Sequence, residues 1–282
     1  MHTVVRSAAI VAILVIFSFL AVPVATHEMN MVSGAIFHQD IGLQNGNSVS
    51  ANWAGYAVVG GNDSVANVTE SFLIPAVNTG GNSYAAFWVG IDGFNGNTVE
   101  QTGILAEPSG HGPHSATQYL VWYEFYPASP VYASFTASAG DNVYASVNYS
   151  AGQFTTYIAV YSTGHLVGTL YHTQAVSGAL DDSAEWIVEA PSSTSGILPL
   201  ANFGTAYFGQ NYTKIALTNY ATVNGAYGPI GSFGSNVQSI TMVTTSGTPE
   251  ATPSSLNDGG SSFTVTYDQV SPSHHGSGPG GR

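Results

Sequence analysis

The chain has no cysteine and very few basic residues. Of its 282 residues none is Cys and only 3 are Lys or Arg, against 16 Asp and Glu. The lack of cysteine excludes disulfides, thiol catalysis and cysteine-ligated metals, so packing alone must hold the fold. Three cations cannot form a basic patch for phosphate, and we therefore expect no nucleic-acid partner.

Charged residues of both signs are scarce, and their balance is strongly acidic. They make up 7% of the chain while hydrophobic residues make up 44%, a composition typical of a folded core rather than of disorder. The formal net charge is -13 at pH 7, but free carboxyl groups titrate near about pH 4. Because few ion pairs exist to be lost in acid, the composition favours a protein adapted to acid. A neutral-pH extracellular protein is the alternative.

The two ends of the chain differ in composition from the middle. Residues 1–26 contain one basic residue and the apolar run 7–24, as in a secretory signal peptide, with an uncleaved membrane anchor as the alternative. Residues 27–49 are polar and suggest a short pro-segment or flexible lead-in, and residues 271–282 form a Gly-, Ser-, Pro- and His-rich flexible tail. We expect a secreted, extracellular protein with one domain over residues 50–270, and no membrane contact unless the leader stays uncleaved.

Short runs rich in Val, Ile, Thr, Tyr and Phe fill the domain, and Gly, Asn, Asp and Pro clusters separate them. No window shows a persuasive helical period. We predict an all-β fold, one two-sheet antiparallel β-sandwich of the concanavalin A-like or jelly-roll type. The expected strands are residues 67–74, 84–91, 98–105, 118–126, 131–138, 142–149, 153–162, 166–172, 185–189, 201–208, 214–217, 238–244 and 262–268.

Two of these strands carry glutamates that strand propensity does not explain. Alternation puts Glu124 on the same face as Trp122 and Tyr126, and it puts Glu185 and Glu189 together on one face of another strand. An isolated buried carboxylate is costly, so Glu185 or Glu189 must be solvated or hydrogen-bonded. Ordinary strands with polar residues facing water are the simpler interpretation.

Five sequence blocks, each weak alone, stand in a fixed order along the domain. They are SANWAGY (50–56), FWVGIDG (87–93), QTG (101–103), WYEFYP (122–127) and AEWIVE (184–189). In this order they resemble the glutamic peptidase (eqolisin) family along nearly the whole mature region, and LPLANFG (198–204) resembles the segment that follows in that family. The resemblance implies a two-sheet sandwich, in agreement with the strand pattern.

The resemblance also implies a catalytic pair, Gln101 and Glu189. The carboxylate of Glu189 would accept a proton from water and return it to the leaving amine. The amide of Gln101 would donate a hydrogen bond to the developing oxyanion and orient the water. Such chemistry needs no metal, no cofactor and no covalent intermediate. We therefore expect a monomeric, acid-acting endopeptidase whose partners are polypeptide substrates.

The family's aromatic cleft maps onto further residues of this chain. The expected substrate-binding residues are Trp53, Trp88, Trp122 and Tyr126, with Asp92 and Glu124 as polar supports.

Two departures from the family pattern flank the pair. Glu100 stands where the family has an apolar residue, and alternation puts it on the face opposite Gln101, where we expect it to be solvated. Ala190 and Pro191 follow Glu189 in place of an acidic-aromatic pair.

Other kinds of site are conceivable from the residues alone. His111 and His114 share a loop and His274 and His275 lie in the tail, but without an evident third ligand we predict no metal site. A noncatalytic carbohydrate-binding or surface β-sandwich would explain the Tyr, Trp and Asn content. A glycosidase would need two carboxyl groups about 5 to 9.5 Å apart across a cleft. Glu124 and Glu189 would be the candidates for this pair.

Overall fold

The structure, a computed structural model, describes residues 42–44, 47–110 and 116–268. The expected leader, most of the expected lead-in and the tail lie outside these ranges, as do His111, His114, His274 and His275. Among the described residues no helix is long and apolar enough to cross a membrane.

Strands dominate the described residues, which confirms the all-β class. The helical segments in this part of the chain are short: α1 (Gln210–Thr213), η1 (Ile230–Asn236) and η2 (Asp258–Gly260). The strands are β1 (Gly42–Gln44), β2 (Asn47–Ser50), β3 (Trp53–Val59), β4 (Val65–Leu73), β5 (Ala85–Ile91), β6 (Val99–Pro108), β7 (Thr117–Tyr126), β8 (Val131–Ala137), β9 (Asn142–Ser150), β10 (Gln153–Ser162), β11 (His165–Gln174), β12 (Ser183–Glu189), β13 (Ser192–Ser193), β14 (Gly196–Ile197), β15 (Thr205–Phe208), β16 (Tyr220–Val223), β17 (Ala226–Pro229), β18 (Val237–Val243), β19 (Pro249–Pro253) and β20 (Phe263–Tyr267).

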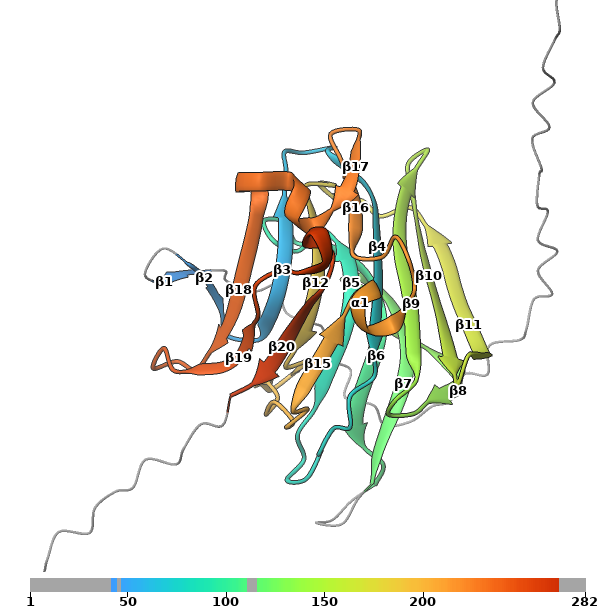
Figure 1. Cartoon of the computed structure of the whole chain (residues 1–282), viewed down its shortest axis with the longest axis vertical. Coiled ribbons are helices and arrows are strands. Elements are labelled where there is room, and N and C mark those ends of the chain that lie inside the picture. Colours follow the sequence, from blue (N-terminus) through green and yellow to red (C-terminus); the bar gives the residue numbers. More distant parts are fainter. Residues whose placement is uncertain (1–41, 45–46, 111–115, 269–282) are drawn as a thin grey trace, which may run out of the picture.

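Backbone hydrogen bonds join these strands, apart from the β13–β14 pair, into one curved sheet. Neighbours run β8–β7–β6–β5–β12–β3–β18, continue through β19, β20 and β15 to β4, and end with β9–β10–β11. All of these pairs are antiparallel, while β2 adds to β18 in parallel. Figure 1 shows β18 and β3 at one side of the molecule and β10 and β11 at the other. Because pairing is continuous through β18, β19 and β20, hydrogen bonding does not divide the strands into two separate sheets.

A large apolar core lies on one face of this sheet, and strand alternation decides which side chains enter it. In β12, Trp186 and Val188 belong to the large core cluster, while Ile187 belongs to a smaller cluster with Trp53 and Trp88. The indole N–H of Trp186 donates a 2.8 Å hydrogen bond to the Thr69 carbonyl of β4, which ties β12 to a strand far from it in the pairing order. The second face of β12 therefore carries Ile187 between Glu185 and Glu189.

Most expected strands are present within a few residues of their predicted ends. The segment 214–217 is a correction, because it follows α1 as a turn and not as a strand. Lys214 and Leu217 have φ values of 64° and 58°, a left-handed backbone that a strand cannot contain. The sequence prediction also omitted β3, although this strand lies centrally between β12 and β18.

Candidate active site

Pairing register brings alternate residues of the five blocks onto one face of β3, β12, β5, β6 and β7. Gln101 pairs with Glu124 of β7 and with Gly90 of β5. Two residues further along, Gly103 pairs with Trp88 and with Trp122. Since residues two apart in a strand share a face, these side chains lie on one side of the sheet.

The same face continues across β12 and β3. Ile187 pairs with Trp88, and Glu189 pairs with Trp53. The smaller apolar cluster contains Trp53, Trp88, Trp122 and Ile187, which is the set that alternation requires on this side. We call this surface the site face, defined by Trp53, Trp88, Gln101, Trp122, Glu124 and Glu189.

Glu189 is fully buried, and two side chains donate hydrogen bonds to its two oxygens. Trp88 Nε1 lies 2.7 Å from Oε2, and Asn52 Nδ2 lies 3.1 Å from Oε1. Trp53 packs edge-on against Trp88 with 5.0 Å between ring centroids. Burial raises the pKa of Glu189 to about 8, and the N–H groups of Trp88, Trp53 and Asn52 oppose that rise by favouring the ionised form. The indole N–H of Trp53 makes no hydrogen bond within the described residues, and it favours ionised Glu189 by lying near the carboxyl group.

Gln101 is also fully buried, and Glu124 fixes its amide. Gln101 Nε2 donates a 2.8 Å hydrogen bond to Glu124 Oε2. Burial raises the pKa of Glu124 well above its ordinary value; the hydrogen bond from Gln101 lowers it, and the charge of Glu189 raises it further. Glu124 is therefore neutral in acid, and Gln101 has one N–H engaged and a second N–H left for another acceptor.

Several buried polar atoms of the site face make no hydrogen bond within the described part of the chain. They include both donors and acceptors: Trp53 Nε1, Trp122 Nε1, Gln101 Oε1 and Glu124 Oε1. Buried polar groups are nearly always paired, so each unpaired one calls for an explanation. A peptide group or a water molecule, each with donors and acceptors of its own, could bind to such a set.

Glycines let the strands of the site face approach closely. A Cβ atom placed on Gly103 would lie 2.2 Å from the Phe87 carbonyl oxygen and 2.6 Å from Trp88 Cβ. One on Gly90 would lie 2.9 Å from Trp88 Cζ3 and 3.2 Å from Gln101 Cβ. Both positions must therefore lack a side chain for Trp88 and Gln101 to sit as they do.

The remaining two expected substrate-binding residues lie at the ends of strands. Tyr126, the last residue of β7, packs half-buried against the tryptophan cluster. Asp92 follows β5, and its carboxylate accepts hydrogen bonds of 2.8, 3.0 and 2.9 Å from the backbone N–H groups of residues 180–182. Asp92 thus supports the segment that leads into β12, and a direct contact with substrate stays a prediction.

Glu100 contradicts the sequence-based expectation of a solvated side chain. It lies on the face opposite Gln101 but is fully buried, because the large core covers that face; its strand neighbours are Ile91 and Phe125. Neither carboxyl oxygen has a hydrogen-bond partner among the described residues. Burial, together with the charges of two aspartates nearby, raises the pKa of Glu100 to about 9.

Sequence reasoning did not assign two residues of this region to the site. Asn52 lies within the SANWAGY block, directly before Trp53, and its amide is a partner of Glu189. Glu185 pairs with Gly90, the residue that also pairs with Gln101, so it shares the site face. It is fully buried, and neither of its oxygens has a hydrogen-bond partner in the described ranges. Alternation in β12 predicted that Glu185 shares a face with Glu189. Only the register between β12 and β5 shows that Glu185 lies beside Gly90.

Metal binding has no support in the described part of the chain. No three His, Asp or Glu side chains in it are grouped so that they could hold a metal ion.

Comparisons with known proteins agree with the order of the motif blocks. Residues 51–267 match the family model described as the Peptidase A4 family. Aspergillopepsin-2 of Aspergillus niger is 30% identical over 185 residues, which cover 56% of this chain and 62% of that protein. The chain thus spans less than two thirds of that relative's length.

Solved structures show the same fold. The crystal structure of aspergilloglutamic peptidase from Aspergillus niger superimposes with a TM-score of 0.52 at 28% identity, over 66% of this chain and 99% of that one. Scytalido-glutamic peptidase with a transition state analog inhibitor has a TM-score of 0.61 at 21% identity, over 77% of this chain and 98% of that one. Since the family model covers most of the described residues, the chain belongs to the Peptidase A4 family, the glutamic peptidases.

Proposed function

We propose that the chain is a secreted endopeptidase that hydrolyses peptide bonds in acid, with Gln101 and Glu189 as its catalytic pair. Family membership supports the reaction class. The observation that carries the assignment is the buried Glu189 carboxyl, held at both oxygens by Trp88 and Asn52 on the face that also bears Gln101. The expected leader, residues 1–26, supports an extracellular location.

The raised pKa of Glu189, about 8, sets the order of proton transfers, because this carboxyl is protonated in acid. In the addition step one oxygen gives its proton to the scissile carbonyl oxygen. The other oxygen takes a proton from the water that attacks the carbonyl carbon, which leaves a gem-diol and a protonated Glu189. As the C–N bond then breaks, Glu189 protonates the leaving nitrogen and accepts a proton from the diol.

This order of proton transfers refines the expectation that Glu189 acts first as a base, because Glu189 here gives a proton and takes one in the same step. The carboxyl group of Glu189 is protonated at the beginning and at the end of the catalytic cycle. The reaction requires no covalent intermediate, metal or cofactor. The N–H groups of Trp88 and Asn52 keep the carboxyl oriented and ease the transient loss of its proton.

Gln101 serves as the donor to the oxygen on which charge develops. Its amide has a second N–H for that oxygen and an unpaired Oε1 that can accept from the attacking water. Glu124 is a positioning residue, because it accepts from Nε2 and so decides which way the amide points. An uncharged amide keeps this function at any pH at which the protein is folded.

The substrate is proposed to be a polypeptide, bound by a single chain of this protein along the site face. Trp53, Trp88, Trp122 and Tyr126 supply apolar walls for its side chains. Asp92 supports the site by holding the segment that leads into β12. Because the paired groups are buried in this structure, substrate binding must open the face. We also propose that the curved sheet forms the two packed layers of a jelly-roll sandwich. The layer that contains β4, β9 and β10 would support the layer that carries the site face.

Glu189→Gln, with Glu185→Gln as its matched control, tests the proposal. The two substitutions make the same nearly isosteric change in one strand, on one face, at two fully buried glutamates. Release of soluble peptides from an acid-denatured protein would be measured from about pH 2 to 7. We expect kcat/KM to fall by about 10³ or more in Glu189→Gln and to stay within about threefold in Glu185→Gln, with both variants folded.

Other outcomes identify the rival functions. Full activity in Glu189→Gln would contradict the assigned pair, and loss confined to Glu185→Gln would move the acid to that residue. No proteolysis by the wild type at any pH would favour a noncatalytic binding domain. Hydrolysis of a polysaccharide by the same preparation would favour a glycosidase that uses Glu124 and Glu189.

A further inference from the structure

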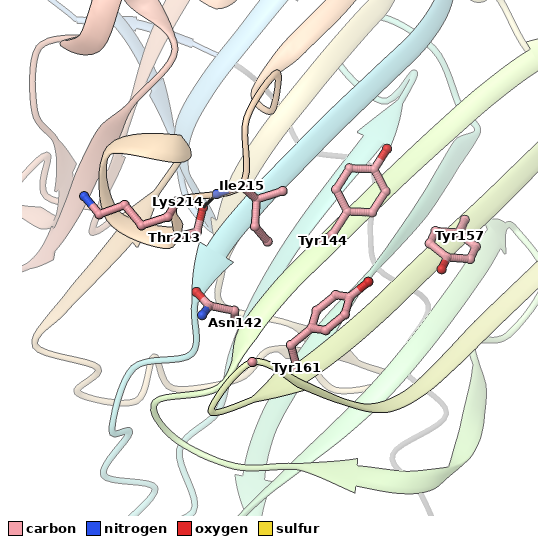
Figure 2. Close-up of a pocket in the computed structure, with 8 residues that line it drawn as sticks. Asn142, Tyr144, Tyr157, Tyr161, Thr213, Lys214 and Ile215 are labelled. Atoms are coloured by element: carbon pink, nitrogen blue, oxygen red, sulfur yellow. Dashed lines mark hydrogen bonds between the residues drawn. The ribbon is translucent and has the colours of Figure 1, made fainter.

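A pocket of about 580 Å³ lies away from the site face, on the outer side of β9 and β10 next to α1. Figure 2 shows three tyrosine rings from these two strands on one side of it and the segment after α1 on the other. Its lining consists of Asn142, Tyr144, Tyr157, Tyr161, Gly164, Thr213, Lys214 and Ile215.

Strand register explains why the three rings stand together. Tyr161 pairs with Asn142, and Tyr144 pairs with Ala159, which lies between Tyr157 and Tyr161 in β10. The short side chain of Ala159, fully buried, leaves room between the rings. Intervening residues of both strands, among them Val143, Ile158 and Val160, point into the large core. The tyrosines therefore project on the side of the sheet that faces away from that core.

The polar groups of the pocket are mostly uncharged. Asn142 Oδ1 is buried and has no hydrogen-bond partner among the described residues, and it belongs to a side chain that lines the pocket. Lys214 is the charged side chain of the lining, but its Nζ donates a 2.6 Å hydrogen bond to the Asn211 carbonyl and points away from the rings (Figure 2). What faces a ligand is thus ring surface, phenol hydroxyl groups and one amide.

These groups match a neutral sugar better than other ligand classes. A pyranose has a flat face of weakly positive C–H groups, which pack on the negative face of an aromatic ring, and a rim of hydroxyl groups for tyrosine and amide partners. The formal charge of -13 at pH 7 disfavours a polyanion. An extended peptide would gain from a free strand edge, but β9 pairs with β4 and β10, and β10 pairs with β9 and β11.

We propose that this tyrosine pocket binds a neutral oligosaccharide, as a site separate from the proposed catalytic pair. Its rings project from the layer opposite β5, β6 and β12, so a bound glycan leaves the site face free. The function it would serve is to hold the protein on a polysaccharide or on the glycans of a glycoprotein.

The test is isothermal titration of the full chain with a panel of neutral cello-, chito-, xylo- and manno-oligosaccharides. We expect at least one of them to bind with a Kd below about 1 mM. Tyr144→Ala and Tyr161→Ala should each weaken that binding about tenfold, and Tyr161→Phe, which keeps the ring, should weaken it less. Tyr207→Ala, at an exposed tyrosine of β15 outside the pocket, is the matched control and should leave the Kd unchanged.

Thermal unfolding of each variant shows whether it is folded before titration. The absence of binding across the panel would overturn the proposal, as would an equal loss in Tyr207→Ala. A titration with an unglycosylated, denatured polypeptide completes the set. If the pocket variants weaken binding of that polypeptide and of no sugar, the pocket is a peptide site instead. Because binding is measured directly, inactivity of Glu189→Gln or of the wild type as a peptidase has no bearing on the result.

Discussion

Trp88 donates its indole N–H to Glu189 across the β5–β12 pair, with 2.7 Å between Nε1 and Oε2. The same ring forms a wall of the site face and packs against Trp53. On the opposite face, Trp186 makes an equivalent 2.8 Å hydrogen bond to a backbone carbonyl in the core. The N–H of Trp88 therefore acts on the titratable group of Glu189, while the N–H of Trp186 only joins two strands. Replacing each tryptophan in turn by Phe can separate these two effects.

Replacing Trp88 by Phe should change the pH dependence of catalysis. The ring is largely kept but the N–H is lost, and because that N–H favours ionised Glu189, the pKa of Glu189 should rise above about 8. We expect kcat/KM to fall about tenfold or more, since a hydrogen bond to a charged group is worth about 1.5 to 3 kcal/mol. The alkaline limb of the kcat/KM profile should move to higher pH.

Trp186→Phe is the matched control for this change. It should lower the melting temperature, because it removes the buried hydrogen bond from the indole N–H to the Thr69 carbonyl, while the alkaline limb stays where it is in the wild type. An unmoved limb in Trp88→Phe would show that Glu189 does not govern it.

Substitutions of Glu124 should separate positioning from acid catalysis. In Glu124→Gln the new amide oxygen can still accept from Gln101, so we expect kcat to stay within about tenfold of the wild type. Glu124→Leu removes the acceptor, the amide of Gln101 loses its orientation, and kcat should fall by about 10² to 10³, the effect of losing an oxyanion donor. Equal, complete inactivity of both variants would mean that the Glu124 carboxyl itself takes part in the chemistry.

Buried carboxyl groups should make the fold less stable as pH rises. The pKa values of Glu70 and Glu185 are well above the ordinary value and that of Glu100 is about 9, chiefly because of burial. The unfolded chain gives up these protons above about pH 4.5 while the folded chain keeps them, so the folded state binds more protons. The resulting stability is complete below about pH 4.5 and falls as pH rises, by up to about 1.4 kcal/mol per pH unit for each group. For Glu100 the loss extends to about pH 9.

Glu100→Gln tests this expectation with melting temperatures measured from about pH 3 to 8. The variant should show a shallower decline than the wild type, because one buried ionisable group is gone. Asp258→Asn, at an exposed aspartate, should follow the wild-type curve. A wild-type melting temperature that is constant or rises over this range would contradict the assignment of neutral, buried glutamates.

Gly103→Ala should disturb the site face through sterics alone. The added methyl would meet the Phe87 carbonyl oxygen at 2.2 Å, so β5 and β6 must move apart and carry Trp88 with them. We expect a loss of about 1 to 3 kcal/mol in the free energy of unfolding together with a large drop in activity. Gly61→Ala, with open space around its Cβ, should change neither. A fully active, stable Gly103→Ala would mean that the strands are not so close in solution.

Local sequence pattern predicted much of this molecule because strands impose a two-residue period. The facing of Trp122 and Glu124, and of Trp186 against Glu185 and Glu189, followed from alternation and agrees with the two apolar clusters. The predicted strand at residues 214–217 was wrong, because the composition of this segment suits a strand while two of its residues adopt positive φ. Solvation of Glu100 was wrong because alternation assigns a face but not what covers that face.

The sequence by itself determined an all-β chain without disulfides, the order of the motif blocks, and the identity of Gln101 and Glu189 as the residues to examine. Only the tertiary structure decided what surrounds them: Asn52 and Trp88 on the Glu189 carboxyl, Glu124 on the Gln101 amide, and Glu185 across β5 from Gln101. The physical reason is that alternation is local to a strand, whereas partners depend on the register between strands far apart in sequence. That register is set by packing of the whole sheet, and no short motif encodes it.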